Sequence, residues 1–443
     1  MKSAGRSDPW RPYEPRAAMP WDLERVVRLH RRSGFAATPA EVRRDLAEGC
    51  EPSLARVLGG RVRAAPPDFE EIQASMAESA VLHGDARRLQ AWWVWRMLVD
   101  PDPLRERLTL LWHDHFATSQ LKVQDLRLMH GQNEVLRAEA RAPFGRLLER
   151  TVKQPALLLW LDAETNRREH PNENLARELM ELFTLGIGHF DEDDVKEAAR
   201  ALTGWTVREE AFVDRDVRHD EGEKVILGQR GRWTGDDLLR LLLAHPATAE
   251  RLARKLAREF LGEGVADDAA VAELATGLRE RGLDLGWAVA TILGSELFFS
   301  DAARGRHIAG PAEFVVGTVR ALGLDDPPPS TLVLASWLTR AGLDLFYPPN
   351  VGGWPGGPSW LAPRELVARA NFARALIEGD GTARPALDEG ALARGLAGLA
   401  GAGDPSTVLT VLSTGRGPSS TAPAAGLRAL ALTLYSGPEV HLS

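Results

Sequence analysis

The sequence predicts an all-helical protein, and three observations lead to this prediction. Apolar residues recur at helical spacing along most of the chain. A clear example is the run formed by Leu175, Leu179, Leu182 and Phe183. A proline follows a capping residue where helices are expected to begin, as at Thr38-Pro39 and Asp102-Pro103. Only residues 205–235 lack the helical pattern, and we expect loops or a small hairpin there.

The chain is expected to contain three parts. Residues 1–19 are rich in Pro, Arg and Ser and are predicted to form a disordered arm. Residues 20–377 are predicted to form the helical core domain. Its expected helices cover residues 21–32, 70–99, 103–116, 125–141, 170–186, 191–202, 236–243, 245–260, 267–281, 287–298, 311–322, 330–341 and 365–377. Two further helices are expected to begin at Pro39 and Pro143. Residues 378–443, rich in Ala, Gly and Pro, are expected to form a helical extension packed on the core.

Composition narrows the classes of function. A net charge of −8 is modest for 443 residues and argues against broad nucleic-acid binding. Cys50 is the only cysteine, which excludes an internal disulfide and a thiolate metal cluster. No run reaches the roughly 18 apolar residues needed to span a bilayer. The N-terminus lacks the apolar stretch of a secretory signal, so a cytoplasmic location is expected.

The most informative stretch is the helix expected over residues 170–186, with Pro171 in its first turn. Glu178 lies at the border between its leucine stripe and its polar face, so this carboxylate is expected to be partly buried. Such a group must be paired, hydrogen-bonded, metal-bound or protonated. Glu178 and Glu181, one turn apart, are therefore candidates for acid–base catalysis or metal ligation. The metal is left open.

The same spacing also permits a purely structural interpretation, and spacing alone favours this interpretation over the functional one. Glu173, Arg177 and Glu181 could form an exposed ladder of ion pairs at i, i+4 spacing, with Glu178 paired elsewhere. Exposed ladders of this kind are common on helices. In the functional interpretation, by contrast, Asn172, Glu173 and Arg177 contact a substrate.

Two histidines on the helix expected over residues 103–116 invite a metal-site interpretation. His113 and His115 are two residues apart, so their side chains diverge and cannot bind one ion on a regular helix. His115 falls on the apolar stripe and is expected to be a hydrogen-bonded core residue. His113 lies about 160° away from it on the helical wheel and is expected to face a cleft, as a catalytic candidate.

Two loops carry the remaining candidate residues. The first loop covers residues 208–235. In it, His219 is a further catalytic candidate, and Asp220 and Lys224 could bind substrate. A solvated loop without such a role is an equally good interpretation. Within it, residues 212–213 are expected to pair with residues 225–227. The second loop, residues 345–360, has too many Pro and Gly residues for a helix or central strand. It presents Trp354 and Trp360, which could stack on a sugar, clasp a peptide, or fill the core.

Several motifs occur together in a fixed order along the chain. They are Leu111-Trp112-His113-Asp114-His115-Phe116, Asn172-Glu173-Asn174 through Leu185-Gly186, Ala201-Leu202-Thr203-Gly204-Trp205-Thr206, His219-Asp220 with Lys224, His245-Pro246-Ala247-Thr248-Ala249, Pro348-Pro349-Asn350-Val351-Gly352-Gly353-Trp354 and Tyr435-Ser436-Gly437-Pro438-Glu439. This set resembles the bacterial family known as domain of unknown function 1800. The resemblance implies an all-helical fold with a mixed middle loop, and it brings no established activity or cofactor.

The resemblance also bears on partners and location. Relatives are often exported and encoded beside another uncharacterised exported family, which points to a protein partner from that family. This chain departs from the pattern by lacking an export signal and by having Leu343 and Asp344 where relatives tend to have a glutamine. The oligomeric state is not indicated.

Two hypotheses of function follow. The first is a metal-assisted hydrolase or a redox enzyme using Glu178 and Glu181, with His113 and His219 as proton carriers or ligands. The second is a non-catalytic binding or assembly protein that holds a protein or carbohydrate through Trp354 and Trp360. The sequence has no phosphate-binding glycine loop, dinucleotide fingerprint or nucleophile elbow that would name a cofactor or reaction.

Overall fold

The computed structural model describes residues 8–380, 385–396, 405–414 and 426–442. Over these residues the protein is predominantly helical, which confirms the predicted fold class. The first helices are α1 (Leu23–Ser33), α2 (Pro39–Glu48), α3 (Cys50–Leu58), α4 (Phe69–Leu82), α5 (Ala86–Val99), α6 (Pro103–His115), α7 (Gln120–Val123) and α8 (Leu126–Ala138). The next are α9 (Phe144–Val152), α10 (Pro155–Trp160), α11 (Asn174–Glu178), the π-helical turn η2 (Leu179–Thr184) and α12 (Glu192–Ala201).

The second half of the chain is also built from helices. They are α13 (Gly235–Ala244), α14 (Pro246–Leu261), α15 (Asp268–Glu280), α16 (Leu285–Leu293), α17 (Glu296–Phe299), α18 (Pro311–Ala321), α19 (Thr331–Arg340), α20 (Pro363–Glu378), α21 (Glu389–Leu396), α22 (Pro405–Thr414) and α23 (Leu427–Ser436). Short 3-10 turns occupy Ala163–Thr165, Asp216–Arg218, Asp301–Ala303, Gly357–Leu361 and Pro438–His441. No helix in the described ranges is long and apolar enough to cross a membrane.

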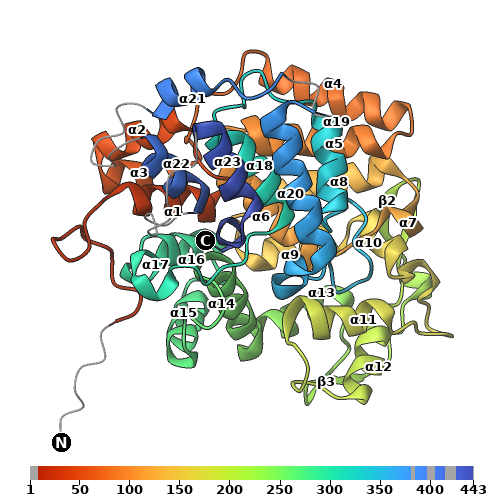
Figure 1. Cartoon of the computed structure of the whole chain (residues 1–443). Helices are drawn as coiled ribbons and strands as arrows, with labels where there is room; N and C mark the ends of the chain where they lie inside the picture. The colour runs from red at the N-terminus through yellow and green to blue at the C-terminus, as the bar shows by residue number, and fades with distance from the viewer. Residues whose placement is uncertain (1–7, 381–384, 397–404, 415–425, 443) are drawn as a thin grey trace, which may run out of the picture.

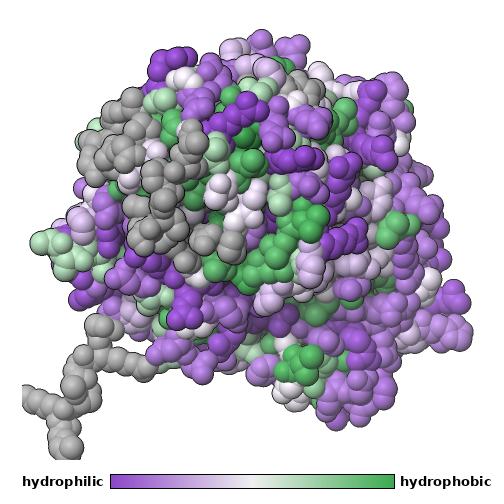
Figure 2. Space-filling model, viewed as in Figure 1, coloured by the Kyte–Doolittle hydropathy of each residue, from purple (hydrophilic) through white to green (hydrophobic). Residues whose placement is uncertain are grey.

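The helices surround two clusters of buried apolar residues. One cluster is built mainly from α6 and α9–α16, and the other from α1, α5 and α18–α23. In Figure 1 the α11 and α12 region lies at the lower right, α14–α17 lie at the lower centre, and α18–α23 lie above them. Helix α6 supplies residues to the first cluster and lies beside the second, so its polar residues lie between the two cores. In Figure 2 most of the visible face is hydrophilic, with hydrophobic residues gathered beside the lower part of α20.

The region predicted to be irregular contains two separate hairpins. Strand β1 (Trp205–Arg208) pairs with β2 (Ala211–Asp214), and β3 (Lys224–Ile226) pairs with β4 (Gln229–Gly231), all antiparallel. The predicted pairing of residues 212–213 with 225–227 is therefore wrong. Each hairpin closes through a two-residue turn with positive φ, Glu209-Glu210 in the first and Leu227-Gly228 in the second. Such turns match the strand twist, so local pairing replaces the longer-range pairing.

The predicted N-terminal arm contacts the core where the structure describes it. Trp10 is buried and its indole nitrogen donates to the Ala270 carbonyl at 2.9 Å. The Tyr13 amide donates to the Gly294 carbonyl at 2.8 Å, and the Tyr13 ring lies 4.4 Å from the Phe299 ring. Residues 8–19 are thus held by α15–α17, and residues 1–7 lie outside the described ranges. At the other end of the chain, α22 and α23 pack against α1 and α20.

Candidate functional site

The helix predicted to carry the site begins later than expected and changes its geometry midway. Helix α11 starts at Asn174, so Pro171 precedes it instead of occupying its first turn. The side chain of Asn172 organises this start, because its Oδ1 accepts from the Asn174 amide at 2.9 Å and its Nδ2 donates to Thr165 Oγ1 at 2.7 Å. Asn172, predicted to bind substrate, therefore forms an Asx turn just before α11.

After Glu178 the chain widens into the π-helical turn η2, which leaves main-chain carbonyls for other partners. The Leu182 carbonyl accepts from Nε and Nη2 of Arg251 on α14, at 3.1 and 2.8 Å. The Phe183 carbonyl lies 3.1 Å from Nε2 of His115. Thr184, which a regular helical wheel places on the polar face with Glu181, is buried and donates to the Leu179 carbonyl. The wider turn rotates Thr184 inward, and such π turns occur frequently at functional sites.

Glu178 is partly buried, as predicted, and its carboxylate makes no hydrogen bond or ion pair with any residue in the described ranges. Burial raises its pKa, and the charge of Glu181 raises it further, against the opposing effect of Arg177. Arg177 binds Glu173 at 2.9 Å and Glu192 of α12 at 2.8 Å instead. The expected ladder therefore contains its Glu173–Arg177 step, but Arg177 then pairs with α12 and not with Glu181.

The two histidines of α6 are both buried but differ in their hydrogen bonding. His115 is buried and bonded to the Phe183 carbonyl, which confirms the expectation of a hydrogen-bonded core residue. His113 is fully buried among aromatic rings, so the expectation that it faces a cleft is wrong. Its ring lies 5.2 Å from Trp93, 5.4 Å from Phe346 and 5.6 Å from Trp354. Helix α5 and the loop at residues 345–360 cover the side of α6 that the helical wheel predicted to face a cleft.

His113 is a polar side chain enclosed by this cage of aromatic rings. Neither ring nitrogen has a hydrogen-bond partner in the described structure. Burial, helped by the charge of Arg137, lowers the pKa of His113 to about 3. The imidazole is therefore neutral at pH 7 and is poorly suited to carrying a proton there. An unpartnered polar group in a core normally costs stability.

The Trp354 loop is fixed to the end of α6. The Trp354 amide donates to Asp114 Oδ1 at 2.9 Å, and the Trp354 indole stacks on His113. Gly353 has φ +89° and lies directly against Asp114. Trp354 is buried and fills the core, whereas Trp360 is partly exposed. The loop is thus a fixed structural element, and Asp114 holds it in place.

Substituting Gly353 should release this loop. A Cβ at position 353 would lie 2.3 Å from Asp114 Oδ1 and 2.7 Å from the Asp114 carbonyl oxygen, and the positive φ adds backbone strain. We expect Gly353→Ala to lower the free energy of unfolding by about 1–3 kcal/mol, measured by urea denaturation. Gly356→Ala is the matched control, because its Cβ would meet nothing within 4 Å and its φ is −88°. Equal losses in both variants would contradict this account.

Asp114 also faces a lysine that the sequence analysis did not single out. Lys255 of α14 places Nζ 3.8 Å from Asp114 Oδ2, a distance too long for a hydrogen bond. Burial raises the pKa of Asp114 and lowers the pKa of Lys255, and each partner's charge opposes the shift in the other. Asp114 lies between the two histidines of the sequence motif, and Lys255 shares a helix face with Arg251. Mapping α14 on a wheel would have identified that face.

A buried ion network lies on the other side of Asp114. Arg107 binds Glu259 and Glu313, each at 2.7 Å, and His307 Nε2 lies 2.8 Å from Glu313 Oε1. These residues line a cavity of about 90 Å³ together with Asp114, Trp354 and Trp360. Despite burial, the charges of Arg107 and His307 hold the pKa of Glu313 far below its usual range. The network satisfies its own charges, so we regard it as structural.

The remaining predicted residues lie after the first hairpin, and Lys224 begins strand β3. His219 Nδ1 is 2.9 Å from the Thr203 carbonyl oxygen. Asp220 binds Arg200 at 2.8 Å, and buried Lys224 donates to the carbonyls of Asp220 and Gly222. These contacts tie the loop to α12. No hydrogen bond or ion pair joins His219, Asp220 or Lys224 to Glu178 in the part of the chain that the structure describes.

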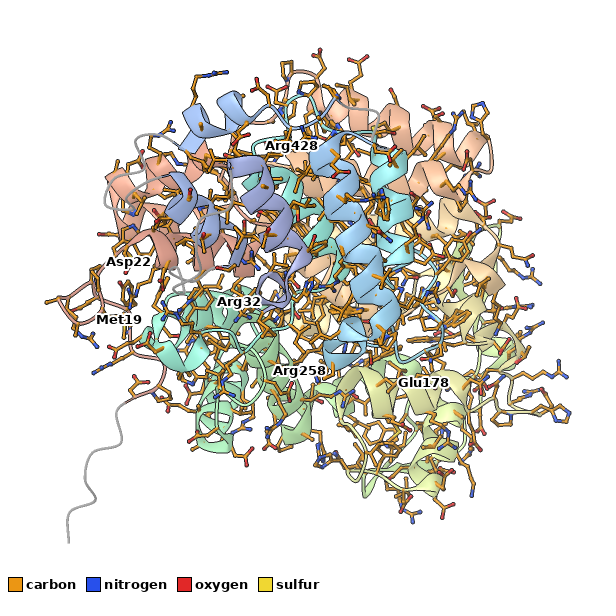
Figure 3. The ribbon with its side chains drawn as sticks, viewed as in Figure 1. Met19, Asp22, Arg32, Glu178, Arg258 and Arg428 are labelled. Carbon is orange, nitrogen blue, oxygen red and sulfur yellow. The ribbon has the colours of Figure 1, made fainter. Side chains whose placement is uncertain are left out.

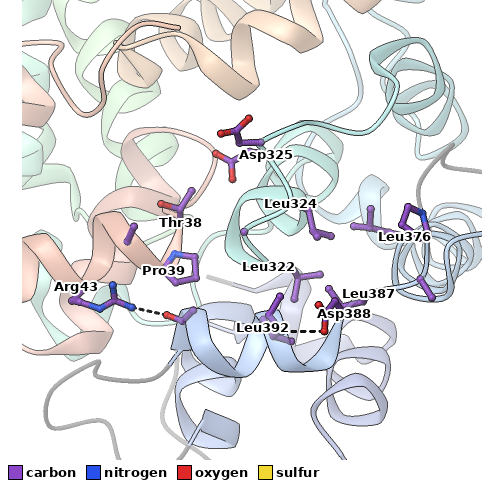
Figure 4. Close-up of a pocket in the computed structure, with 17 residues that line it drawn as sticks. Thr38, Pro39, Arg43, Leu322, Leu324, Asp325, Leu376, Leu387, Asp388 and Leu392 are labelled. Carbon is purple, nitrogen blue, oxygen red and sulfur yellow. Dashed lines mark hydrogen bonds between the residues drawn. The ribbon is translucent and has the colours of Figure 1, made fainter.

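Two further observations concern ligands. A cavity of about 580 Å³ lies between α2, the end of α18 and α21, where Arg43 donates to the Gly395 carbonyl (Figure 4). None of the predicted site residues lines it. Among the described residues no group of three His, Cys, Asp or Glu side chains could hold a metal ion. The metal-assisted form of the enzyme hypothesis therefore has no ligand set in these ranges.

The fold and these sites define a predominantly helical protein whose unpaired acidic residue lies beside a π turn. The chain belongs to the family described as protein of unknown function DUF1800, whose sequence profile matches residues 28–439. This confirms the resemblance seen in the motifs. A search of curated proteins and a search of solved structures each found no match.

Proposed function

We propose that this protein is a hydrolytic enzyme in which Glu178 transfers a proton. The observation that carries the proposal is the unpaired, partly buried carboxylate of Glu178 beside the π turn. Arg177, the nearest cation on this helix, is already paired with Glu173 and Glu192 and leaves Glu178 without a counter-ion among the described residues. Carboxyl groups whose surroundings raise their pKa are suited to general acid–base catalysis.

Glu181 would assist Glu178 through its charge. The negative charge of Glu181 raises the pKa of Glu178, because two nearby like charges repel. The negative charge of Glu181 interacts electrostatically with Arg251, which also donates a hydrogen bond to the Leu182 carbonyl of the π turn. Arg251 thereby holds the backbone of the π turn that carries Glu181 against α14. His113 and His219 are given no role in proton transfer by this proposal.

The binding alternative has less support. Trp354 is buried against His113, so it is not available to stack on a sugar or a peptide. Trp360 remains partly exposed and lines the small cavity next to Asp114. If the protein acts in assembly, a partner from the co-encoded family would contact Trp360 and not Trp354.

The proposal predicts that Glu178→Gln removes activity without unfolding the protein. The purified protein would be tested on chromogenic carboxyl esters, phosphoesters and glycosides, and the best substrate would be used for the variants. We expect a loss of about 100-fold or more in kcat, the usual size of an acid–base contribution. The midpoint of urea unfolding should stay the same or rise, because the variant removes a poorly solvated charge.

Glu192→Gln is the control, because Glu192 is an exposed glutamate of α12 whose pairing with Arg177 is separate from Glu178. It should retain full activity. A Glu178→Gln variant that unfolds would show the residue to be structural, and one that keeps full activity would end the proposal.

A further inference from the structure

One face of α14 carries four basic residues. Arg251, Arg254, Lys255 and Arg258 fall within about 100° of each other on the helical wheel. All four line a cavity of about 350 Å³ that is closed at one end by the turn at residues 262–264. Glu263 is the one acidic residue in the lining, so the cavity carries a net positive charge.

The basic residues nearest the core are poorly compensated. Arg251 uses Nε and Nη2 on a neutral acceptor, the Leu182 carbonyl. Lys255 has an acidic neighbour in Asp114, but the 3.8 Å separation is longer than a hydrogen bond. Burial lowers the pKa of both Arg251 and Lys255, and the charge of Arg258 lowers both further. The cations therefore repel one another within the cavity.

The two outer residues are similarly available to a ligand. Arg254 binds Asp268 at 2.9 Å, but both side chains are largely exposed, so this pair contributes little stability. Arg258 has Glu263 as its nearest acidic partner, with 4.0 Å between Nε and Oε2. No hydrogen bond from the Arg258 guanidinium to another described residue is present. Figure 3 shows Arg258 on α14, well separated from Glu178 on α11.

Cations in the last turns of a helix also stabilise its dipole, and this effect needs no ligand. It explains positive charge near Gly262, where α14 ends. It does not explain why Lys255 and Arg251, about two and three turns from the end of α14, line the same cavity. Four side chains converging on one concave surface instead match the geometry of an anion site.

We propose that this cavity binds the doubly charged oxyanion of a phosphate monoester. The guanidinium groups of Arg254 and Arg258 provide forked donors that match phosphate oxygens. Arg251 adds the charge of a guanidinium held by the Leu182 carbonyl, and Lys255 adds a point charge at the inner end. The volume suits a small ligand or a single headgroup. The inference does not depend on the proposed hydrolytic activity, because it concerns binding alone.

The test uses the full-length protein and isothermal titration calorimetry with glycerol 3-phosphate, at constant ionic strength set with chloride. A second arm measures co-sedimentation with vesicles containing phosphatidic acid, against vesicles of phosphatidylcholine alone. Binding in the first arm identifies a soluble phosphate monoester as the ligand source, and binding only in the second identifies a lipid headgroup. Binding in neither arm overturns the proposal.

The decisive variant is Arg258→Gln, which removes a cavity cation that has no close structural partner. We expect affinity for the phosphate probe to fall about tenfold or more, the size expected for one charge-assisted contact. Arg240→Gln on α13 is the control, because Arg240 is an exposed arginine outside the cavity. It should bind as the wild type does. Equal affinity in the two variants would mean that the anion binds elsewhere and would overturn the proposal.

Discussion

Replacing Glu106 with glutamine should lower the free energy of unfolding by about 3–5 kcal/mol. Glu106 is fully buried on α6, and its carboxylate accepts from Arg137 Nε at 2.6 Å, Arg96 Nε at 3.3 Å and Trp93 Nε1 at 3.1 Å. Burial opposes ionisation, but Arg137 and Arg96 lower the pKa of Glu106 to about 2. Without this charge, two buried guanidinium groups lose their shared counter-ion.

The matched control is Glu134→Gln, because Glu134 contacts the same arginine. It binds Arg137 at 2.5 Å but is 41% exposed, so water can replace it. We expect this variant to lose less than about 1 kcal/mol. Urea denaturation gives the two free energies, and hydrogen–deuterium exchange should locate the Glu106→Gln effect in α5, α6 and α8. Equal losses of unfolding free energy would show that the burial of Glu106 does not make its ion pairs more important for stability than the exposed pair of Glu134.

This cluster also supports the cage around His113. The Trp93 indole that donates to Glu106 places its ring against His113, and Arg137 contributes to the lowered pKa of that histidine. The buried ion cluster and the aromatic cage are therefore one structural unit. A perturbation of Glu106 should reach the loop that carries Trp354 through this unit.

The sequence predicted local features well because their causes are local. Asp102 caps α6 and Pro103 occupies its first position, as the pattern indicated. The wheel placed His115 on the apolar stripe, where it lies. It could not place His113, because a wheel ranks the faces of one helix and does not show what covers them. Trp93 and Phe346, which cover His113, lie far from it in the chain.

The π turn explains why Thr184 departs from its place on the helical wheel. A helical wheel assumes a constant angle per residue, and η2 breaks this assumption after Glu178. Glu178, before the turn, lies partly buried as predicted, whereas Thr184, at its end, turns inward. The turn is held by Arg251 and His115, which are distant in sequence. A pattern read along one helix does not contain these contacts.

His113 should make the protein sensitive to acid, and removing it should reduce that sensitivity. Its pKa is about 3 in the folded protein, compared with an ordinary value near 6.5 in the unfolded chain. Between these values the unfolded chain binds a proton that the folded protein does not. The free energy of unfolding is thus unaffected by this titration above pH 6.5, and it decreases as the pH falls from 6.5 toward 3. The loss is about 1.4 kcal/mol per pH unit.

The variant His113→Phe tests this directly, because phenylalanine fits an aromatic cage and has no polar atoms to satisfy. We expect the free energy of unfolding at pH 7 to rise by about 1–3 kcal/mol. The decrease between pH 7 and pH 5 should be smaller than in the wild type by about 2 kcal/mol. Urea denaturation at a series of pH values measures both quantities.

His115→Phe supplies the control with the opposite sign. His115 is equally enclosed, and burial also lowers its pKa, but its ring nitrogen is bonded to the Phe183 carbonyl. Its replacement should therefore flatten the acid response as well, yet lower stability at pH 7 by about 1–2 kcal/mol. If His113→Phe also loses stability at pH 7, the ring nitrogens of His113 have partners in solution, and the cage is a polar binding site instead of a strained core.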